Sequence, residues 1–170
     1  MKKIDHPGLI LCDLQAQAFE LSLEAFSCSS EIFIRRFMNS MAAKELDSGS
    51  ALNTVVTPMD LLGRVEEQYG VSKYGSVKYS ANEIYWIGYI YRYFSYTYEL
   101  SSSQVFRMIK PKDLKTMYPA YHTMDCAQAI ERFFESKGIE LADTIEKQYQ
   151  VFRRIRKPAD HSSSPEASGI

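Results

Sequence analysis

The chain has 170 residues, of which 45% are hydrophobic and 24% are charged, and this composition suits one globular domain with a sizeable core. A formal net charge of −1 excludes a chain-wide field that would attract nucleic acid or anionic membrane, so either partner would need a local basic patch. Three widely spaced cysteines without a C-x-x-C pair argue against a disulfide framework and a zinc site, and indicate reduced thiols in a cytoplasmic protein.

The first residues do not resemble a secretory signal peptide, because acidic residues and a proline interrupt the short apolar run that follows Lys2-Lys3. The tyrosine-rich stretch 80–100 does not resemble a membrane span either. Glu83, Arg92 and Glu99 interrupt it, and its phenol hydroxyls would lack partners in lipid. We therefore expect a soluble protein with no membrane partner.

In chain order, residues 1–14 are expected to form an irregular leader. A first helix is expected over 15–26, where apolar residues recur at helical spacing. Two serines, Ser29 and Ser30, are candidate N-caps of a second helix over 31–46.

Thr57-Pro58-Met59-Asp60 is the clearest helix start in the chain. A threonine can cap the helix, a proline is tolerated at the first helical position, and an acidic residue is favourable in the first turn. This helix is expected to end near Gly70, and residues 71–79 are expected to form a polar connection.

The stretch 80–100, SANEIYWIGYIYRYFSYTYEL, is the centre of the predicted fold. It contains the only tryptophan, Trp86, and six of the twelve tyrosines. A strand is the competing interpretation, because residues that favour strands fall on one period-2 face. However, Ser80 and Glu83 form a capping box, the stretch is apolar or aromatic on all sides, and it is longer than an ordinary strand. We therefore predict a buried central helix.

Shorter segments follow the central helix. Ser101 and Gln104 form a second capping box, and the short helix that they open is expected to end at Pro111. One further helical turn is expected over 113–117, and residues 118–123 are expected to be irregular.

Near the end of the chain, Thr123 is expected to cap a helix that ends at Gly138, and a last amphipathic helix is predicted over 139–156. The polar, proline- and serine-rich residues 157–170 are expected to form a disordered tail. The sequence therefore predicts an all-α fold, with one compact domain of about six or seven helices over 15–156.

No catalytic or metal-binding motif stands out. His6, His122 and His161 lie in segments expected to be leader, loop and tail, so we predict no metal site. Cys126 follows His122 near a predicted helix start, where the pKa of a thiol can be lowered, and an enzyme that uses this pair is one hypothesis. The simpler interpretation is a loop-closing histidine and a buried cysteine. We predict no cofactor and no enzymatic activity.

Residues 81–109 have helix-turn-helix proportions, with two predicted helices joined by a tight turn and followed by basic residues. The candidate DNA-binding residues are Gln104, Arg107, Lys110 and Lys112. Several apolar side chains of the second helix look like core residues, which argues against this interpretation. The basic run 153–157 adds to it, although cations are also common at exposed helix ends.

The tyrosines of the central helix favour protein binding. A fully buried helix cannot easily satisfy six phenol hydroxyls, and tyrosine is enriched at protein–protein contacts. We therefore expect one face of this helix in the core and another against a partner. The candidate partner-binding residues are Tyr85, Tyr89, Arg92, Tyr93, Tyr96, Tyr121 and His122.

Residues 29–135 resemble a group of small helical proteins of low-GC Gram-positive bacteria and their mobile elements. The shared motifs are SSEIFIRRFMNS, W-I-G-Y-x-Y-R-Y, S-S-x-Q-V-F, K-P-K-D-L and Y-H-T-x-D-x-x-Q-A-I-E-R. These proteins resemble the antitoxins of toxin–antitoxin systems, some of which lie beside toxins resembling ADP-ribosyltransferases.

The resemblance carries over no catalytic residue. It implies a non-enzymatic antitoxin that neutralises a cognate toxin, encoded nearby, by direct protein–protein binding. The alternative is a helix-turn-helix transcriptional regulator that binds DNA. The two functions can coexist, since the resemblance also implies repression of the protein's own operon. A homodimer is a further option.

Overall fold

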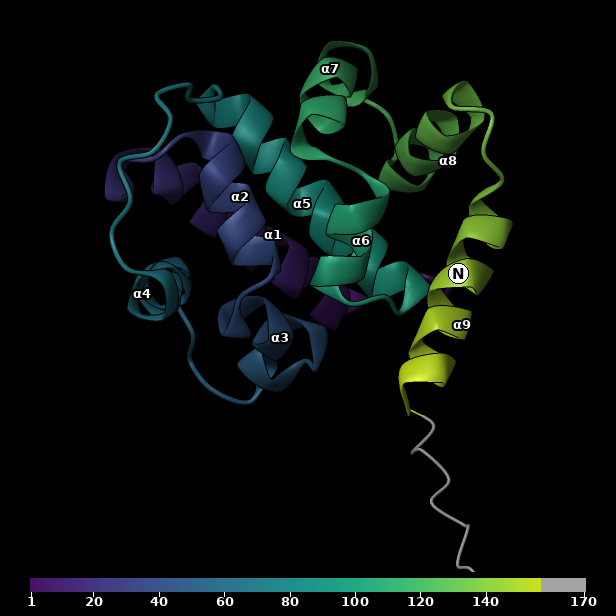
Figure 1. Ribbon diagram of the computed structural model, residues 1–170, viewed down its shortest axis with the longest axis horizontal. Coiled ribbons are helices and arrows are strands. Elements are labelled where there is room, and N and C mark those ends of the chain that lie inside the picture. The colour runs from purple at the N-terminus through teal and green to yellow at the C-terminus, as the bar shows by residue number, and fades with distance from the viewer. Residues whose placement is uncertain (157–170) are drawn as a thin grey trace, which may run out of the picture. The chain divides into compact units, whose positions relative to one another are not determined.

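The computed structural model describes residues 1–156, which form nine α-helices and one 3₁₀ turn and contain no strand (Figure 1). The elements are α1 (His6–Ala25), α2 (Ser30–Met38), α3 (Met41–Asp47), η1 (Ser50–Leu52), α4 (Pro58–Tyr69), α5 (Ala81–Tyr98), α6 (Ser102–Met108), α7 (Pro111–Tyr121), α8 (Cys126–Ser136) and α9 (Leu141–Arg156). The all-α prediction is confirmed, with more helices than expected. The chain divides into two compact units, Met1–Phe133 and a second unit that begins at Phe134.

Helix α5 is the central helix predicted over 80–100. The Ser80 hydroxyl accepts a hydrogen bond from the Glu83 amide at 3.2 Å, as expected of an N-cap. The helix ends at Tyr98, and Glu99 follows in the left-handed conformation. Most of its residues are buried, as the all-round hydrophobicity predicts.

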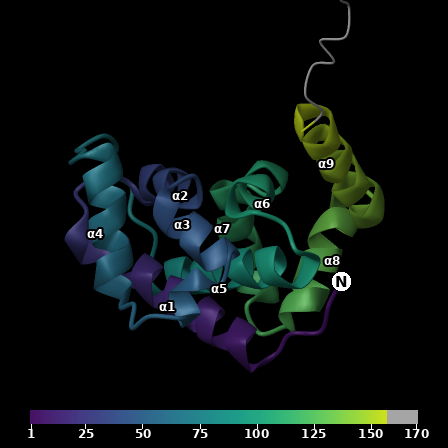
Figure 2. The same ribbon diagram turned by 90° about the horizontal axis from the view of Figure 1, so that it is seen from below.

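Within the first unit, α5 lies between α1 on one side and α2, α6 and α7 on the other (Figures 1 and 2). The contact between α1 and α5 is the most extensive in the fold. It depends on Gly88, because a Cβ atom at this position would lie 2.8 Å from Phe19 Cγ and 3.0 Å from Ala16 Cα. The two helices therefore approach closely only because residue 88 has no side chain.

An aromatic cluster joins α1 to α2. The Phe19 ring meets Phe33 and Phe37 edge to face, with centroids 5.3 Å and 5.0 Å apart, and Phe26 lies against Phe33. Such pairs contribute about 0.5–1.5 kcal/mol each beyond the area that they bury. The cluster fixes α2 against α1 beside the central helix.

The predicted irregular leader is wrong, because α1 begins at His6 and residues 6–14 are its first turns. The Asp5 carboxylate accepts a hydrogen bond from the Gly8 amide at 2.9 Å and caps the helix. Pro7 lies in the first turn, where a missing amide costs nothing. Asp5 and Pro7 look like breakers of an apolar run, but both are favourable at a helix start.

The helix predicted over 31–46 is divided into α2 and α3. Ser40 separates them, because its hydroxyl accepts a hydrogen bond from the Ala43 amide at 3.2 Å and caps α3. The apolar spacing continues through this break, so periodicity alone does not locate it.

The irregular segment expected over 118–123 is also wrong, because α7 continues to Tyr121 with Pro119 inside its last turn. A proline at this point removes only one helical hydrogen bond, to the carbonyl of the exposed Lys115. Asp125, not Thr123, caps α8, since its carboxylate accepts from the Ala127 amide at 2.9 Å.

The second unit contains the end of α8 and all of α9, which agrees with the helix predicted over 139–156. Its presence divides the single domain expected over 15–156. No residue of α9 is buried. The tail predicted over 157–170 lies outside the described residues. Within residues 1–156, none of the helices combines the length and hydrophobicity needed to cross a membrane.

Candidate protein-binding surface

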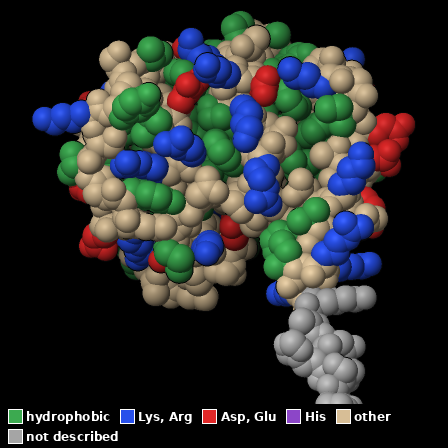
Figure 3. Space-filling model, viewed as in Figure 1, with side chains coloured by type: hydrophobic (Ala, Val, Ile, Leu, Met, Phe, Trp, Pro, Cys, Tyr) green, Lys and Arg blue, Asp and Glu red, His purple; other side chains and the backbone are tan. Residues whose placement is uncertain are grey.

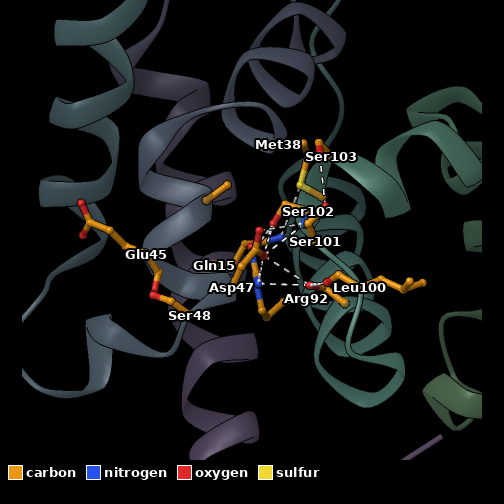
Figure 4. A network of polar contacts seen from close by, with 12 residues as sticks. Gln15, Met38, Glu45, Asp47, Ser48, Arg92, Leu100, Ser101, Ser102 and Ser103 are labelled. Carbon is orange, nitrogen blue, oxygen red and sulfur yellow. Dashed lines mark hydrogen bonds and ion pairs between the residues drawn. The ribbon is translucent and has the colours of Figure 1, made fainter. Parts of the chain in front are cut away.

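Arg92, a predicted partner contact, lies inside the protein, with only 1% of its side chain exposed. Its Nε donates to Gln15 Oε1 at 2.9 Å, its Nη1 to Asp47 Oδ1 at 2.6 Å, and its Nη2 to Ser102 Oγ at 2.6 Å (Figure 4). This prediction is therefore wrong, because a partner protein cannot reach a guanidinium group enclosed in this way.

Asp47 is the second centre of this polar network. Its carboxylate accepts hydrogen bonds from the Ser102 amide at 3.0 and 3.1 Å and from the Ser102 hydroxyl at 2.6 Å. Gln15 extends the network, since its Nε2 donates to the Gly88 carbonyl at 3.0 Å. These bonds connect α1, α3, α5 and α6.

The polar network is complete, as a buried arginine requires. Among the described residues, no buried side-chain nitrogen or oxygen lacks a hydrogen-bond partner. The network thus has a structural role, and it holds the start of α6 beside the end of α3.

Two of the tyrosines predicted to contact a partner connect α5 to α1 and its N-cap instead. Tyr85 and Tyr96 are half-buried, and their hydroxyls donate to Asp13 Oδ1 at 2.5 Å and to Asp5 Oδ1 at 2.6 Å. Burial is the main cause that raises the pKa of Tyr85 to about 12, whereas the bond to Asp5 is the main cause that raises the pKa of Tyr96 to about 12. Their hydroxyls need no external acceptor.

Tyr93 is 8% exposed, so its assignment as a partner contact is wrong as well. The hydroxyl of Tyr91, which is buried, donates to the Ile109 carbonyl at 2.7 Å. Tyr89 remains half-buried, and burial raises its pKa to about 12. The surplus of phenols in α5 is therefore accommodated largely within the protein.

Cys126 does not have the character of an activated nucleophile. Burial, followed by the neighbouring Asp125 carboxylate, raises the pKa of its thiol to about 11. His122 Nδ1 lies 2.7 Å from the Tyr118 carbonyl. The lowering expected at a helix start is thus outweighed by burial. In the part of the chain that the structure describes, no group of three histidine, cysteine or acidic side chains could hold a metal ion.

An aromatic stack reaches the surface at the end of α7. The exposed His122 ring stacks on Tyr118, with centroids 4.5 Å apart and planes inclined by 21°. Tyr118 meets the buried Trp86 of α5 edge to face at 5.8 Å. With the half-buried Tyr121, these residues form the aromatic patch. Its outer members, Tyr121 and His122, are predicted contact residues that do reach the surface.

A groove of about 250 Å³ lies between α2 and the junction of α6 with α7. Its walls include the cations Arg35, Lys110 and Lys112 and the apolar residues Ile32, Phe106 and Pro111. We call it the basic groove. Figure 3 shows lysine and arginine side chains gathered over this face, with hydrophobic side chains between them.

One of the four candidate DNA-binding residues does not reach the surface. Gln104 is 5% exposed, and its Oε1 accepts a hydrogen bond from the Ser101 amide at 2.8 Å, as the predicted capping box requires. A side chain buried in this way cannot contact DNA, so the assignment of Gln104 as a DNA-binding residue is wrong. Arg107, Lys110 and Lys112 are exposed.

Sequence reasoning did not point to Arg35 or Phe106 as parts of a site. They are far apart in the sequence, and only the packing of α2 beside α6 brings them to one groove. The charge-rich pair Arg35-Arg36 in the middle of an apolar helix was the one available signal.

No protein-family model, curated protein or solved structure matches the chain. The resemblance to antitoxins therefore rests on the sequence motifs alone.

Proposed function

We propose that this protein is a non-enzymatic antitoxin that neutralises a cognate toxin, encoded nearby, by direct protein–protein binding in the cytoplasm. The motif resemblance supports this function, and it allows an ADP-ribosyltransferase-like toxin as the partner. The single observation that carries the proposal is the aromatic patch.

The aromatic patch has the properties of a protein-binding hot spot. Tryptophan and tyrosine dominate such spots, which lie in well-packed surroundings. Here Trp86 is fixed in the core, and Tyr118 holds the exposed His122 ring by stacking. A surface that is ordered in advance loses little conformational entropy on binding.

The proposed contact set differs from the one predicted from the sequence. Tyr121 and His122 are its centre. Tyr85, Tyr89 and Tyr96 remain candidates, because their side chains are only half-buried. Arg92 and Tyr93 are excluded by their burial.

Co-expression with the product of the neighbouring gene tests this function. We expect relief of toxicity and co-elution of the two proteins at micromolar concentration. The double variant Tyr121→Ala/His122→Ala should weaken binding by at least about tenfold, as expected of hot-spot residues. Tyr74→Ala is the matched control, because Tyr74 is 76% exposed and lies outside the aromatic patch. Separate elution without relief of toxicity would overturn the proposal.

DNA binding is a second candidate function, favoured by three exposed cations close together in the sequence, Arg107, Lys110 and Lys112. An antitoxin that represses its own operon would use both functions. This candidate predicts salt-dependent retardation of the protein's own promoter fragment, weakened by Arg107→Ala. Absence of retardation at low salt would remove it.

A further inference from the structure

We propose that the basic groove binds an acidic segment of the partner protein. One carboxylate of this segment would lie between the cations of the groove, and one apolar side chain would pack against the apolar lining residues. This inference rests on the proposed function and deepens it, because it assigns a chemistry to the partner. It also adds a contact surface that the predicted set of residues does not include.

The charge of the groove supports an acidic occupant. Arg35 comes from α2, whereas Lys110 and Lys112 flank the start of α7, and all three side chains are exposed. Within residues 1–156, ion pairs join Arg64 to Glu45 and Arg92 to Asp47, so none of the groove's cations has a carboxylate partner. A carboxylate from another protein could form ion pairs with these cations.

The one acidic residue of the groove is already engaged. Glu31 Oε1 accepts a hydrogen bond from the Tyr79 hydroxyl at 2.9 Å. This contact directs part of the Glu31 carboxylate toward the protein. Three cations against one partly engaged carboxylate leave the groove with an excess of positive charge.

The lining and the volume favour a side chain over a small molecule. Ile32, Phe106 and Pro111 supply apolar surface, and Lys110 Nζ lies 4.5 Å from the centre of the Phe106 ring. About 250 Å³ is below the usual 300–1,000 Å³ of small-molecule pockets. It suits one or two anchoring side chains, as in the central pockets of protein interfaces.

The same features argue against nucleic acid as the occupant. Duplex DNA presents one phosphate about every 1.7 Å, so it is bound best by a continuous row of cations. The Glu31 carboxylate lies among the lining residues, so the cations of the groove do not form a continuous row. Gln104, one of the four candidate DNA-binding residues, is buried.

Charge reversal in the full-length protein tests the inference against the toxin from the neighbouring gene. We expect Arg35→Glu/Lys112→Glu to weaken toxin binding by at least about tenfold, mainly through slower association, and to reduce its dependence on salt. The control Lys44→Glu/Lys73→Glu reverses two exposed cations outside the groove and should bind within about threefold of the wild type.

Binding kinetics at low and at physiological salt are the measurement, and circular dichroism verifies the fold of each variant. If the reversed protein is misfolded, Arg35→Gln/Lys112→Gln replaces it and should still weaken binding. Wild-type affinity in a folded groove variant overturns the inference and leaves the proposed function intact. Loss of promoter binding with toxin binding retained assigns the groove to DNA and also overturns it. Failure of the wild type to bind the toxin overturns both.

Discussion

Arg92 and Arg35 are the same side chain in opposite surroundings. Arg92 is enclosed at the centre of α5 and bonded to Gln15, Asp47 and Ser102, whereas Arg35 lies in an exposed groove without a carboxylate partner among residues 1–156. A buried charge is tolerated only when its hydrogen bonds are complete, so the first arginine has no capacity left for a ligand. An unpaired surface cation costs little and remains available for binding.

The tyrosines show the same contrast between side chains bonded within the protein and side chains available at the surface. Tyr85 and Tyr96 use their hydroxyls to connect α5 with α1, and Tyr91 bonds to the carbonyl of Ile109. By contrast, the aromatic patch at the end of α7 turns the exposed His122 ring outward, stacked on Tyr118. Aromatic content alone therefore does not distinguish a core helix from a binding surface, whereas the partners of each hydroxyl do.

The largest expected effect is loss of the interior arginine. Arg92→Met removes the cation beside Asp47 and the donor to Gln15 Oε1, and should lower the free energy of unfolding by about 3–5 kcal/mol. The thermal midpoint should fall by about 10 °C. Arg35→Met is the surface control, and should change stability by less than about 0.5 kcal/mol. Urea denaturation of both variants is the measurement, and equal effects would contradict the contrast between them.

A smaller effect is expected from a methyl group placed in the interior. Gly88→Ala forces the new Cβ against Phe19 and Ala16, and should cost about 1–3 kcal/mol. The matched change Gly63→Ala lies in α4, where nothing is within 4 Å of the new atom, and should stabilise the protein by up to about 1 kcal/mol. Urea denaturation measures the change in the free energy of unfolding, and opposite signs for the two variants would confirm the contrast. An unchanged free energy of unfolding for Gly88→Ala would show that α1 and α5 can separate slightly.

The smallest single-site effect concerns alkaline pH. Burial raises the pKa of Cys12 from 9.0 to about 12 and that of Tyr89 from 10.0 to about 12. The unfolded chain therefore loses these protons first, so stability is fully present below about pH 9 and falls as pH rises toward 12. Urea denaturation at several pH values above neutral measures this decline. Tyr89→Phe removes one titrating group and should make the decline shallower; an unchanged slope would exclude Tyr89 as a contributor.

The capping signals were readable from the sequence because each one acts over three residues. Ser80, Thr57 and Ser101 all cap the predicted helices, through hydrogen bonds to the amides of Glu83, Asp60 and Gln104. The same local rule applies to Asp5, whose carboxylate caps α1. This helix start was not predicted, because Asp5 looked like an interruption of an apolar run. Helix identity and the burial of α5 thus follow from local chemistry and composition.

The sequence by itself determined an all-α fold around a buried aromatic helix, because capping and hydrophobicity act within a few residues. Only the tertiary structure decided which charges are interior and which are free to bind. Arg92 meets Asp47 across 45 positions and Gln15 across 77, and the basic groove joins α2 to α7. Such pairings depend on which helices pack together, and no local pattern of residues encodes that choice.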